Sequence, residues 1–178
     1  MKLILIDAGP AAGKNTLGEL VVKQLKGSGE NAILLDLDRY TEQFNPTWIW
    51  NNEEEKKSDQ LKALINNAKD IDKYLRKEFI VIVIGERFLT KQNIDIFLKR
   101  IEIKAPVYLY HLSIPFALRE ARLLERGGPH WLIDLKKDQE DRDAISEWPG
   151  CIYENINSPE VDSSNLMKLM REEKGRIA

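Results

Sequence analysis

A run of small residues around one lysine, from Ala8 to Thr16, has the residue types and spacing needed to hold phosphate groups. The run follows an apolar stretch and precedes a helical pattern, which is the context that such a loop requires. Small side chains let successive backbone N–H groups point into one concavity, and the helix N-terminus adds partial positive charge. Lys14 would bring an ammonium group to the β- and γ-phosphates, and Thr16 would place a hydroxyl at the start of the helix.

We therefore predict a nucleotide site in this loop, with Lys14 catalytic and Thr16 a ligand of Mg²⁺. The residues predicted to bind ATP here are Gly9, Ala11, Ala12, Gly13, Lys14, Asn15 and Thr16. The strict pattern G-x-x-x-x-G-K-[ST] has glycine in place of Ala8 and a hydroxyl residue in place of Asn15. With Thr16 one place later, the loop resembles that of nucleoside-monophosphate kinases and related small kinases. A small-residue turn without a ligand is the alternative explanation.

Carboxylates follow the second apolar run, which covers residues 32–37. Ligands of open α/β sheets bind outside the carboxyl ends of the strands, and alternation along a strand would put Asp36 and Asp38 on one face. A carboxylate there can orient or deprotonate an acceptor hydroxyl, or hold a water of the Mg²⁺ shell. We predict that Asp36 is catalytic and binds metal, and that Asp36, Asp38 and Arg39 bind the acceptor. Solvated carboxylates that cap the next helix are the alternative.

An acidic residue and an arginine, Glu86 and Arg87, follow the third apolar run, residues 79–84. They resemble the D-R-[YFH] or E-R-S element of thymidylate kinases and deoxynucleoside kinases. Those enzymes use this acidic residue and arginine to bind the acceptor and its phosphate or the transferred group. The resemblance implies that Glu86 and Arg87 bind the substrate and that Arg87 is catalytic. A salt-bridged surface pair is the alternative.

Three arginines share one face of a predicted helix, because Arg119, Arg122 and Arg126 follow one another at helical spacing. Their surroundings resemble the stretch L-x-x-x-P-x-x-A-L-x-R-x-x-x-R-G that introduces the lid in thymidylate kinases and their relatives. A phosphoryl-transfer transition state spreads charge over several oxygens, and guanidinium forks stabilise such charge well. We therefore expect Arg122 and Arg126 to be catalytic, and Arg122 also to bind ATP. A basic helix face paired with glutamates is the alternative.

Other chemistry-bearing residues give weaker signals. Trp48, close to Trp50, could stack on an acceptor and is a candidate substrate-binding residue, although a place in ordinary core is as good an explanation. Arg142 resembles part of the R-x-D lid element of adenylate kinases, but a solvated helix face is the preferred prediction. For His111, on a buried strand, we predict a core position with satisfied hydrogen bonds.

The elements that must position these residues alternate along the chain. Apolar runs predict strands at 2–6, 32–37, 79–84, 107–112 and 152–156, and helical patterns predict helices at 16–26, 53–77, 91–103, 115–126, 133–147 and 159–171. Strands that are apolar on both faces and separated by helices indicate a covered parallel sheet. We predict an α/β protein with a three-layer α/β/α P-loop NTPase fold. Its five-stranded parallel sheet has the order 2-3-1-4-5 that the resemblance implies.

Length and composition limit the alternatives. A chain of 178 residues is the size of one domain, so we predict a single domain over 1–178, with an acceptor-covering insert at about 39–78 and a short lid at about 127–147. The net charge of -2 offers no electrostatic footprint for duplex nucleic acid or an anionic membrane. Cys151 is the only cysteine, which excludes an intramolecular disulfide and a cysteine-based zinc site. No apolar run approaches the ~20 residues of a membrane helix, so we expect a cytoplasmic protein.

Taken as a whole, the sequence resembles P-loop kinases of the nucleoside and nucleotide kinase-like group, with similarities to small shikimate- and gluconate-type kinases. The resemblance implies an ATP-dependent phosphotransferase that uses Mg²⁺ and moves the γ-phosphoryl group to a nucleoside, a nucleotide or another hydroxyl compound. No N-K-x-D element is present, which disfavours Ras-like GTPases. A nucleotide-binding regulatory ATPase or switch is the main alternative, in which Asn15 would weaken Mg²⁺ binding. A polynucleotide 5′-kinase is a weaker one, because the net charge does not favour a nucleic-acid partner.

Overall fold

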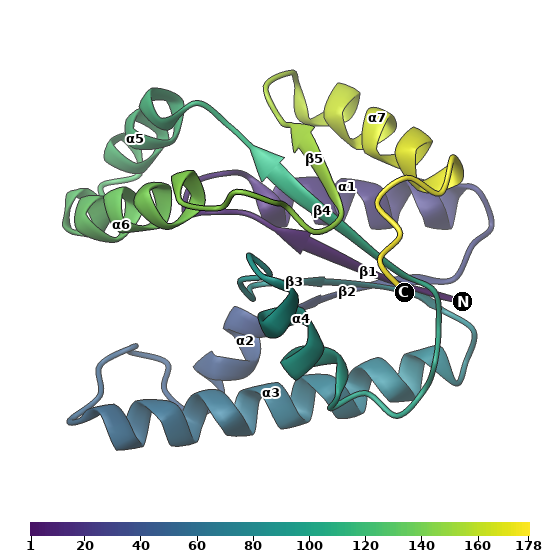
Figure 1. Cartoon of the computed structure of the whole chain (residues 1–178), viewed down its shortest axis with the longest axis horizontal. Coiled ribbons are helices and arrows are strands. Elements are labelled where there is room, and N and C mark those ends of the chain that lie inside the picture. The colour runs from purple at the N-terminus through teal and green to yellow at the C-terminus, as the bar shows by residue number, and fades with distance from the viewer.

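The apolar runs of the sequence form one parallel sheet, as the computed structural model of all 178 residues shows (Figure 1). Its strands are β1 (Lys2–Asp7), β2 (Ala32–Asp36), β3 (Ile80–Ile84), β4 (Val107–Ser113) and β5 (Cys151–Glu154). They lie in the order β2-β3-β1-β4-β5, and every neighbouring pair is parallel. The predicted order 2-3-1-4-5 is therefore confirmed, with β1 in the centre and the phosphate-loop sequence at its carboxyl end.

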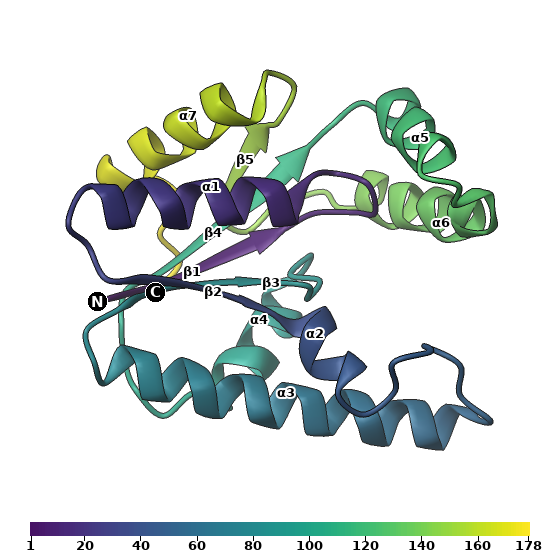
Figure 2. The ribbon, with the colours of Figure 1, turned by 180° about the vertical axis from the view of Figure 1, so that it is seen from behind.

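Helices cover both faces of this sheet. They are α1 (Lys14–Gly27), α2 (Leu37–Glu42), α3 (Glu53–Leu75), α4 (Lys91–Leu98), α5 (Phe116–Glu125), α6 (Leu132–Asp143) and α7 (Pro159–Arg171), with a short 3₁₀ helix at Pro129–Trp131. Figures 1 and 2 show α1 and α7 on one face and α3 and α4 on the other. None of these helices combines the length and the apolar character needed to cross a membrane.

Two apolar cores lie on either side of the sheet, which confirms the three-layer arrangement. One core joins the sheet to α1 and α7 through fully buried side chains such as Leu17, Val21 and Leu166. The other joins it to α3 and α4 through Ile71, Leu75 and further buried residues. Nearly every residue of β1, β3 and β4 is buried, because helices cover both faces of these strands.

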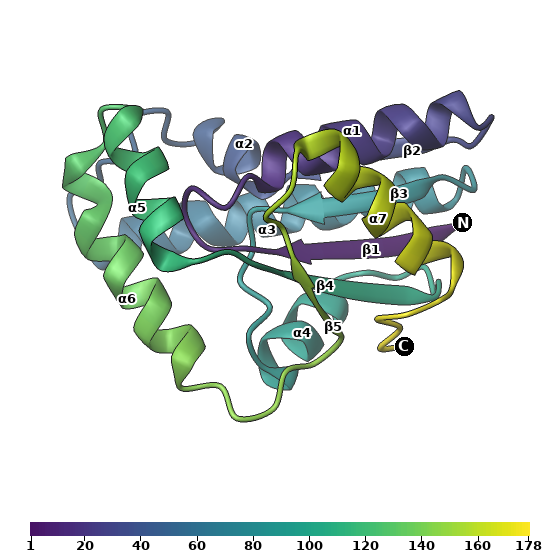
Figure 3. The ribbon, with the colours of Figure 1, turned by 90° about the horizontal axis from the view of Figure 1, so that it is seen from above.

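Helices α5 and α6 are exceptions, because they lie beyond the carboxyl ends of the strands instead of on a face of the sheet (Figure 3). The 3₁₀ helix joins them, so that this pair folds back over the loop that follows β1. The 3₁₀ helix and α6 lie within the range predicted to form a lid, about 127–147, whereas α5 precedes it. As a result, charged side chains of α5 and α6 meet the phosphate-loop sequence.

The end of β2 differs from the prediction. The strand ends at Asp36, and α2 begins at Leu37. The Asp36 carboxylate caps this helix by accepting a hydrogen bond of 3.1 Å from the Asp38 backbone N–H. The prediction that strand alternation puts Asp36 and Asp38 on one face is therefore wrong, because the cap turns the chain into a helix between them.

A C-terminal segment covers part of one strand edge. Strand β5 pairs with β4 only from Tyr110 onward, and residues 175–178 run along the earlier part of β4. The Val107 N–H donates to the Ala178 carbonyl at 2.9 Å, and the Leu109 N–H donates to the Gly175 carbonyl at 2.9 Å. This segment therefore satisfies backbone groups that the short fifth strand leaves uncovered.

Candidate active site

The loop between β1 and α1 presents backbone donors to a possible anion. Gly13, at φ 81°, precedes the helix, and no side chain caps its N-terminus. The N–H groups of Lys14, Asn15 and Thr16 have no hydrogen-bond partner within the protein. Free donors at the start of a 14-residue helix form an anion site, and the chemistry of these donors fits the phosphates of ATP.

Asn155, the residue directly after β5, anchors the loop between β1 and α1. The Asn155 side-chain amide donates to the Ala12 carbonyl at 2.9 Å. A Cβ atom at Gly13 would lie 3.5 Å from the Asn155 amide nitrogen and 4.0 Å from Nη1 of Arg122. The Arg122 guanidinium is therefore close to the loop, as the sequence predicted for an ATP-binding arginine.

Two cavities open on either side of this loop. The first, of about 230 Å³, is lined by Gly13, Thr16, Leu17, Arg122, Arg126, Asn155, Asn157 and Pro159. The second, of about 400 Å³, is lined by Ala8, Pro10, Lys14, Gly85, Glu86, Arg87, Asp134, Lys137 and Asp138. The structure thus brings Arg122 and Arg126 together with Thr16, and brings Lys14 together with Glu86 and Arg87.

Lys14, which lines the second cavity, faces the carboxylate of Asp38, which lines neither cavity. The Lys14 Nζ atom lies 3.6 Å from Asp38 Oδ2. Burial raises the pKa of Asp38, against the opposing effect of the Lys14 charge, and the negative charge of Asp36 adds to the rise. Burial also raises the pKa of Glu86, which lines the cavity. Carboxylates with raised pKa values next to a cavity are suited to accept a proton.

Asp36 is buried beneath this pair and does not line either cavity. Its Oδ2 atom accepts a hydrogen bond of 2.7 Å from the Asn15 side-chain amide, and its Oδ1 atom caps α2. Gly85 allows this close packing, because a Cβ atom there would lie 2.9 Å from Asp36 Oδ1 and its φ is 90°. Asp36 therefore holds the turn that carries Asp38, and Asn15 links that turn to the phosphate loop.

The predicted metal ligands have different neighbours. Thr16 lines the cavity of the two arginines, whereas Asp36 is bonded to Asn15. No group of three or more His, Cys, Asp or Glu side chains is placed to hold a metal ion. Thr16 and Asp36 could supply only a minority of the ligands of Mg²⁺. Nucleotide phosphates and water would have to supply the others.

A carboxylate of α6, Asp138, lies among three arginines. Its Oδ2 atom is 2.8 Å from Arg119 Nη1 and 2.9 Å from Arg142 Nε, and its Oδ1 atom is 3.4 Å from Arg87 Nη2. The side chain of Asp138 is only 7% exposed, so these charges interact with little screening. Arg87 also pairs with Asp141 at 3.0 Å, which ties the predicted catalytic arginine to α6.

The last residue of β1, Asp7, continues this network beneath the loop. It is fully buried and lies 2.8 Å from His111 Nδ1 and 2.8 Å from Arg142 Nη1. Burial acts to raise the pKa of Asp7, but the hydrogen bonds from His111 and Arg142 hold it below its ordinary value. The prediction of a solvated Arg142 is wrong, because α6 folds back and directs this side chain to Asp7. His111 is a satisfied core residue, as predicted.

Asp138 also lies directly against the phosphate loop. A Cβ atom added to Gly9 would overlap Asp138 Oδ2 and Arg119 Nη1. Gly9 was predicted to approach a nucleotide phosphate, and in this structure it also permits the contact with α6.

Four predicted substrate residues lie outside both cavities, namely Asp36, Asp38, Arg39 and Trp48. Arg39 is on the exposed side of α2, with 71% of its side chain exposed, and its nearest carboxylate is Glu19 at 3.9 Å. Trp48 packs edge-on against Trp50, whose ring N–H donates to Asp59 of α3. Neither residue lines the cavity that contains Lys14.

Sequence reasoning missed three residues of the site, namely Asp7, Asp138 and Arg142. A charged residue at the end of an otherwise apolar central strand was the available signal for Asp7. The partial R-x-D match was the available signal for Arg142, and Asp138 has no motif of its own. The contacts of both depend on α6 folding back onto the loop.

Comparison with known proteins gives matches in structure only. No family model matches the chain, and no curated protein matches its sequence. APS kinase of Mycobacterium tuberculosis, solved in complex with AMPPNP and APS, matches with a TM-score of 0.63 at 15% identity, over 96% of this chain and 97% of that one. A sugar kinase from Janibacter sp. HTCC2649 matches with a TM-score of 0.66 at 15% identity, over 96% and 95%.

Shikimate kinase from Aquifex aeolicus vf5 matches with a TM-score of 0.60 at 20% identity, over 97% of this chain and 98% of that one. These proteins are small-molecule kinases of the P-loop type, which is the fold group that the sequence resembled. At such low identity the likeness shows that this chain shares their fold.

Proposed function

We propose that this protein transfers the γ-phosphoryl group of ATP to a hydroxyl of a small acceptor. The observation that carries the proposal is the pair of Lys14 and Asp38, 3.6 Å apart, of which Lys14 lines the cavity of about 400 Å³. It joins a phosphate-binding cation to a carboxylate able to take a proton. The APS kinase with the same fold supports the proposal, because its structure contains AMPPNP together with an acceptor.

The loop and the lysine bind the phosphates in this proposal. The free N–H groups of Lys14, Asn15 and Thr16 donate to phosphate oxygens, and the Lys14 ammonium offsets their charge. ATP would supply the phosphoryl group, and Mg²⁺ would supply further neutralisation of its oxygens when bound.

Asp38 accepts the proton of the acceptor hydroxyl as the new bond to phosphorus forms. Its raised pKa favours this, because a carboxylate with a higher pKa is a stronger base. Asp36 acts as a positioning residue, since it caps the helix that carries Asp38 and accepts from Asn15 of the phosphate loop.

Arginines on both sides of the loop neutralise the charge that the transferred group carries. Arg122 and Arg126 line the cavity with Thr16, and Arg87 lines the cavity with Lys14. Guanidinium forks suit oxygens that share negative charge. The α5–α6 segment would exclude water, which otherwise competes with the acceptor hydroxyl.

The second cavity favours a compact, polar acceptor. Only one of its nine lining residues is hydrophobic, and none is aromatic. A base or another flat ring would find no stacking surface there, whereas a polyol, sugar or hydroxy acid could bond to Lys14, Glu86 and Arg87. We therefore propose a hydroxyl compound of this kind as the acceptor.

The experiment is an ADP-release assay with Mg·ATP and a panel of sugars, polyols, hydroxy acids, nucleosides and nucleotides. We expect stimulation above the background without acceptor by at least one polar hydroxyl compound. Lys14→Ala should abolish it, whereas Lys23→Ala, on the exposed side of α1, should not change it. Binding of ATP without stimulation by any acceptor would contradict the proposal and favour a regulatory ATPase.

Asp38 gives a prediction for the pH profile. A base works only when deprotonated, so kcat/KM should fall as the pH drops through the pKa of Asp38 in the free enzyme. Because that pKa is raised, the acid limb should lie above the ordinary aspartate value of 3.8. Asp38→Asn should lower kcat by about 10²–10⁴ and remove this limb. An unchanged limb in the variant would assign it to another group.

A further inference from the structure

The first cavity, which contains Thr16, Arg122 and Arg126, also contains two asparagine side chains that the proposed phosphotransfer does not use. They are Asn155, directly after β5, and Asn157, two residues before the start of α7. Hydrogen bonds within the protein fix the nitrogen end of each amide. The oxygen ends therefore determine which groups of a ligand these two residues can bind.

Asn155 presents an accessible acceptor to the first cavity. Its Nδ2 atom donates to the Ala12 carbonyl at 2.9 Å, and a carbonyl only accepts, so the amide nitrogen must lie on that side. Asn155 is 8% exposed, and its Oδ1 atom, which accepts no hydrogen bond from the protein, retains accessible surface. Because Asn155 lines the cavity, a ligand can reach this oxygen.

A buried carboxylate fixes the second asparagine. Asp162, in the first turn of α7, is 1% exposed and accepts hydrogen bonds of 2.9 Å from the backbone N–H and from Nδ2 of Asn157. It also accepts from the Tyr153 hydroxyl at 2.6 Å. Because an ionised carboxylate only accepts, Nδ2 of Asn157 must face Asp162. The Oδ1 atom is then the end of the amide that remains for a ligand.

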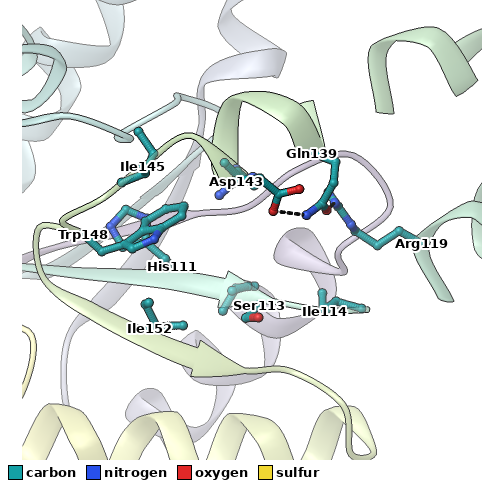
Figure 4. Close-up of a pocket in the computed structure, with 11 residues that line it drawn as sticks. His111, Ser113, Ile114, Arg119, Gln139, Asp143, Ile145, Trp148 and Ile152 are labelled. Carbon is teal, nitrogen blue, oxygen red and sulfur yellow. Dashed lines mark hydrogen bonds between the residues drawn. The ribbon is translucent and has the colours of Figure 1, made fainter. Parts of the chain in front are cut away.

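Of the cavities near the phosphate loop, the first is the one that can hold the nucleoside part of ATP. The second contains Lys14 and takes the acceptor in the proposed function. A third cavity, of about 310 Å³, lies beside the end of β4 and the segment that follows α6 (Figure 4). None of the residues from Ala8 to Thr16 lines it, whereas Gly13 and Thr16 line the first. A nucleoside in the first cavity can therefore stay joined to phosphates on the loop.

The first cavity also offers a surface for a flat ring. Arg122 and Arg126 form no salt bridge, and the planar guanidinium group of an arginine packs well against aromatic faces. In the second cavity Arg87 is instead bonded to Asp138 and Asp141 of α6. A nucleotide base is therefore better placed in the first cavity than in the second.

Two acceptor oxygens in one cavity favour a base that donates. An amino group on an aromatic ring has two N–H donors, which suits two amide oxygens, whereas a ring carbonyl in its place would put acceptor against acceptor. A site built to hydrogen-bond a particular group discriminates strongly against an analogue that lacks it, because the polar atoms of the site are then left unpaired.

We propose that the Oδ1 atoms of Asn155 and Asn157 accept hydrogen bonds from the amino group of adenine, so that these residues determine which nucleotide the protein binds. Asp162 is a positioning residue, because it acts through Asn157. The inference rests on the proposed use of ATP. It concerns nucleotide binding and is tested without an acceptor.

The first test compares the binding of ATP, inosine triphosphate and 2′-deoxy-ATP to the whole protein by calorimetry. Inosine triphosphate has a carbonyl in place of the amino group, and we expect it to bind at least about ten-fold more weakly than ATP. Equal binding of ATP and inosine triphosphate would overturn this inference and leave phosphotransfer untouched. Weaker binding of 2′-deoxy-ATP alone would place the donor on the ribose and also overturn it. Absence of binding by all three would contradict the proposed function as well.

Variants identify the residues that read the base. Asn157→Ala removes one acceptor oxygen, so the affinity ratio of ATP to inosine triphosphate should fall by about three-fold or more. Asn31→Ala is the control, because Asn31 is exposed and precedes β2, at the opposite end of the sheet from the phosphate loop. An unchanged ratio in Asn157→Ala would overturn the assignment.

Asp162→Asn tests the positioning role. An amide at this place can donate to Asn157 and no longer fixes which end of that side chain faces the ligand. We expect the affinity ratio of ATP to inosine triphosphate to fall as in Asn157→Ala, with a smaller change in the affinity for inorganic triphosphate, which has no base. Equal losses for ATP and inosine triphosphate would make the role of Asp162 merely structural and contradict positioning.

Discussion

At the scale of single residues, the candidate site consists of opposite charges that hold one another. Lys14 pairs with Asp38, Arg87 with Asp138 and Asp141, and Arg142 with Asp7 and Asp138. Arg122 and Arg126 differ, because neither forms a salt bridge within 4.0 Å, so their guanidinium groups remain available to a ligand. This difference makes Arg122, the nearer to Gly13, the first arginine to test.

Arg122→Lys should lower turnover much more than ATP affinity. Lysine keeps the positive charge but loses the planar fork that matches several phosphate oxygens. We expect kcat to fall by about 10² or more, with a small change in the dissociation constant of ATP. Arg39→Lys is the control, because Arg39 is exposed and outside both cavities. Equal losses of turnover and affinity would make Arg122 a binding residue only.

Asp7→Asn should destabilise the protein strongly. The variant leaves the buried Arg142 and His111 without the carboxylate that both contact at 2.8 Å. Breaking a buried ion pair on one side costs about 3 kcal/mol or more of unfolding free energy. Asp95→Asn removes the exposed pair with Lys91 and should cost less than ~0.5 kcal/mol. Chemical denaturation measures both.

The same carboxylate gives a pH dependence with a definite sign. The folded state lowers the pKa of Asp7, so its contribution is fully present above the unfolded value of 3.8 and is lost as the pH falls below it. The stability difference between the original protein and Asp7→Asn should therefore shrink below pH 3.8. If this difference in unfolding free energy stayed constant as the pH fell below 3.8, the result would contradict a lowered pKa of Asp7.

Individual site residues were predictable only where the residues that act together are also neighbours in the sequence. The loop around Lys14 combines its small residues, its cation and its helix start in one short run, so the pattern alone indicates it. Arg142 follows Asp7 by 135 positions, and no spacing rule connects two residues at that separation. Their contact comes from the folding of α6, which local sequence does not encode.

At the scale of elements, the closest contact at the site is between α6 and the phosphate loop. Asp138, on a buried turn of α6, and Arg119, on α5, both lie where a side chain at Gly9 would be. The two helices and the loop therefore fit together only because Gly9 has no side chain.

Gly9→Ala tests this fit. The added methyl group should push α6 away from the loop, lower the unfolding free energy by about 1–3 kcal/mol and weaken nucleotide binding. Gly27→Ala is a matched control, because a Cβ atom there meets nothing within 4 Å. It should leave both properties unchanged or slightly raise stability. Thermal unfolding and nucleotide titration of both variants provide the comparison.

Element types were easier to predict than element ends. Ser158 and Pro159 marked the start of α7, and the structure confirms both the cap and the first position. The helix predicted to reach residue 103 ends at Leu98, and α2 was not predicted because its six residues are too few for a periodic pattern. The cap at Asp36 was considered only as an alternative.

At the scale of the whole molecule, a short C-terminal segment completes the sheet. Residues 175–178 bond to the part of β4 that β5 leaves uncovered, and the Ile177 N–H donates to the Val107 carbonyl at 2.8 Å. Uncovered strand edges promote association between chains.

Deletion of residues 175–178 should therefore lower the unfolding free energy by about 2 kcal/mol or more and promote self-association. Arg176→Ala is the control, since that side chain bonds only to the Ala178 carbonyl and the variant keeps the backbone contacts. Denaturation and size-exclusion chromatography distinguish the two. A deletion variant as stable and monomeric as Arg176→Ala would contradict this role of the segment.

The overall architecture was the most predictable feature. Strands that are apolar on both faces and separated by helices can form few sheet topologies, because the crossover connections are right-handed. The resemblance to P-loop kinases implied the order 2-3-1-4-5, which the structure has. The position of α5 and α6 was less predictable, because these helices bury few apolar residues and are held largely by charged contacts.

The carboxylate of Asp138 has a consequence for how phosphate reaches this protein. Arg87, Arg119 and Arg142 already surround an anion, so a phosphate that bonds to Nη2 of Arg87 exchanges with a carboxylate instead of filling a bare cationic site. In such an ion exchange the net charge of the arginine cluster changes little. The affinity of that step for phosphate should then vary less steeply with ionic strength than binding to unpaired arginines would. The free energy of that step thus includes the loss of the contacts between Arg87 and the carboxylates of α6.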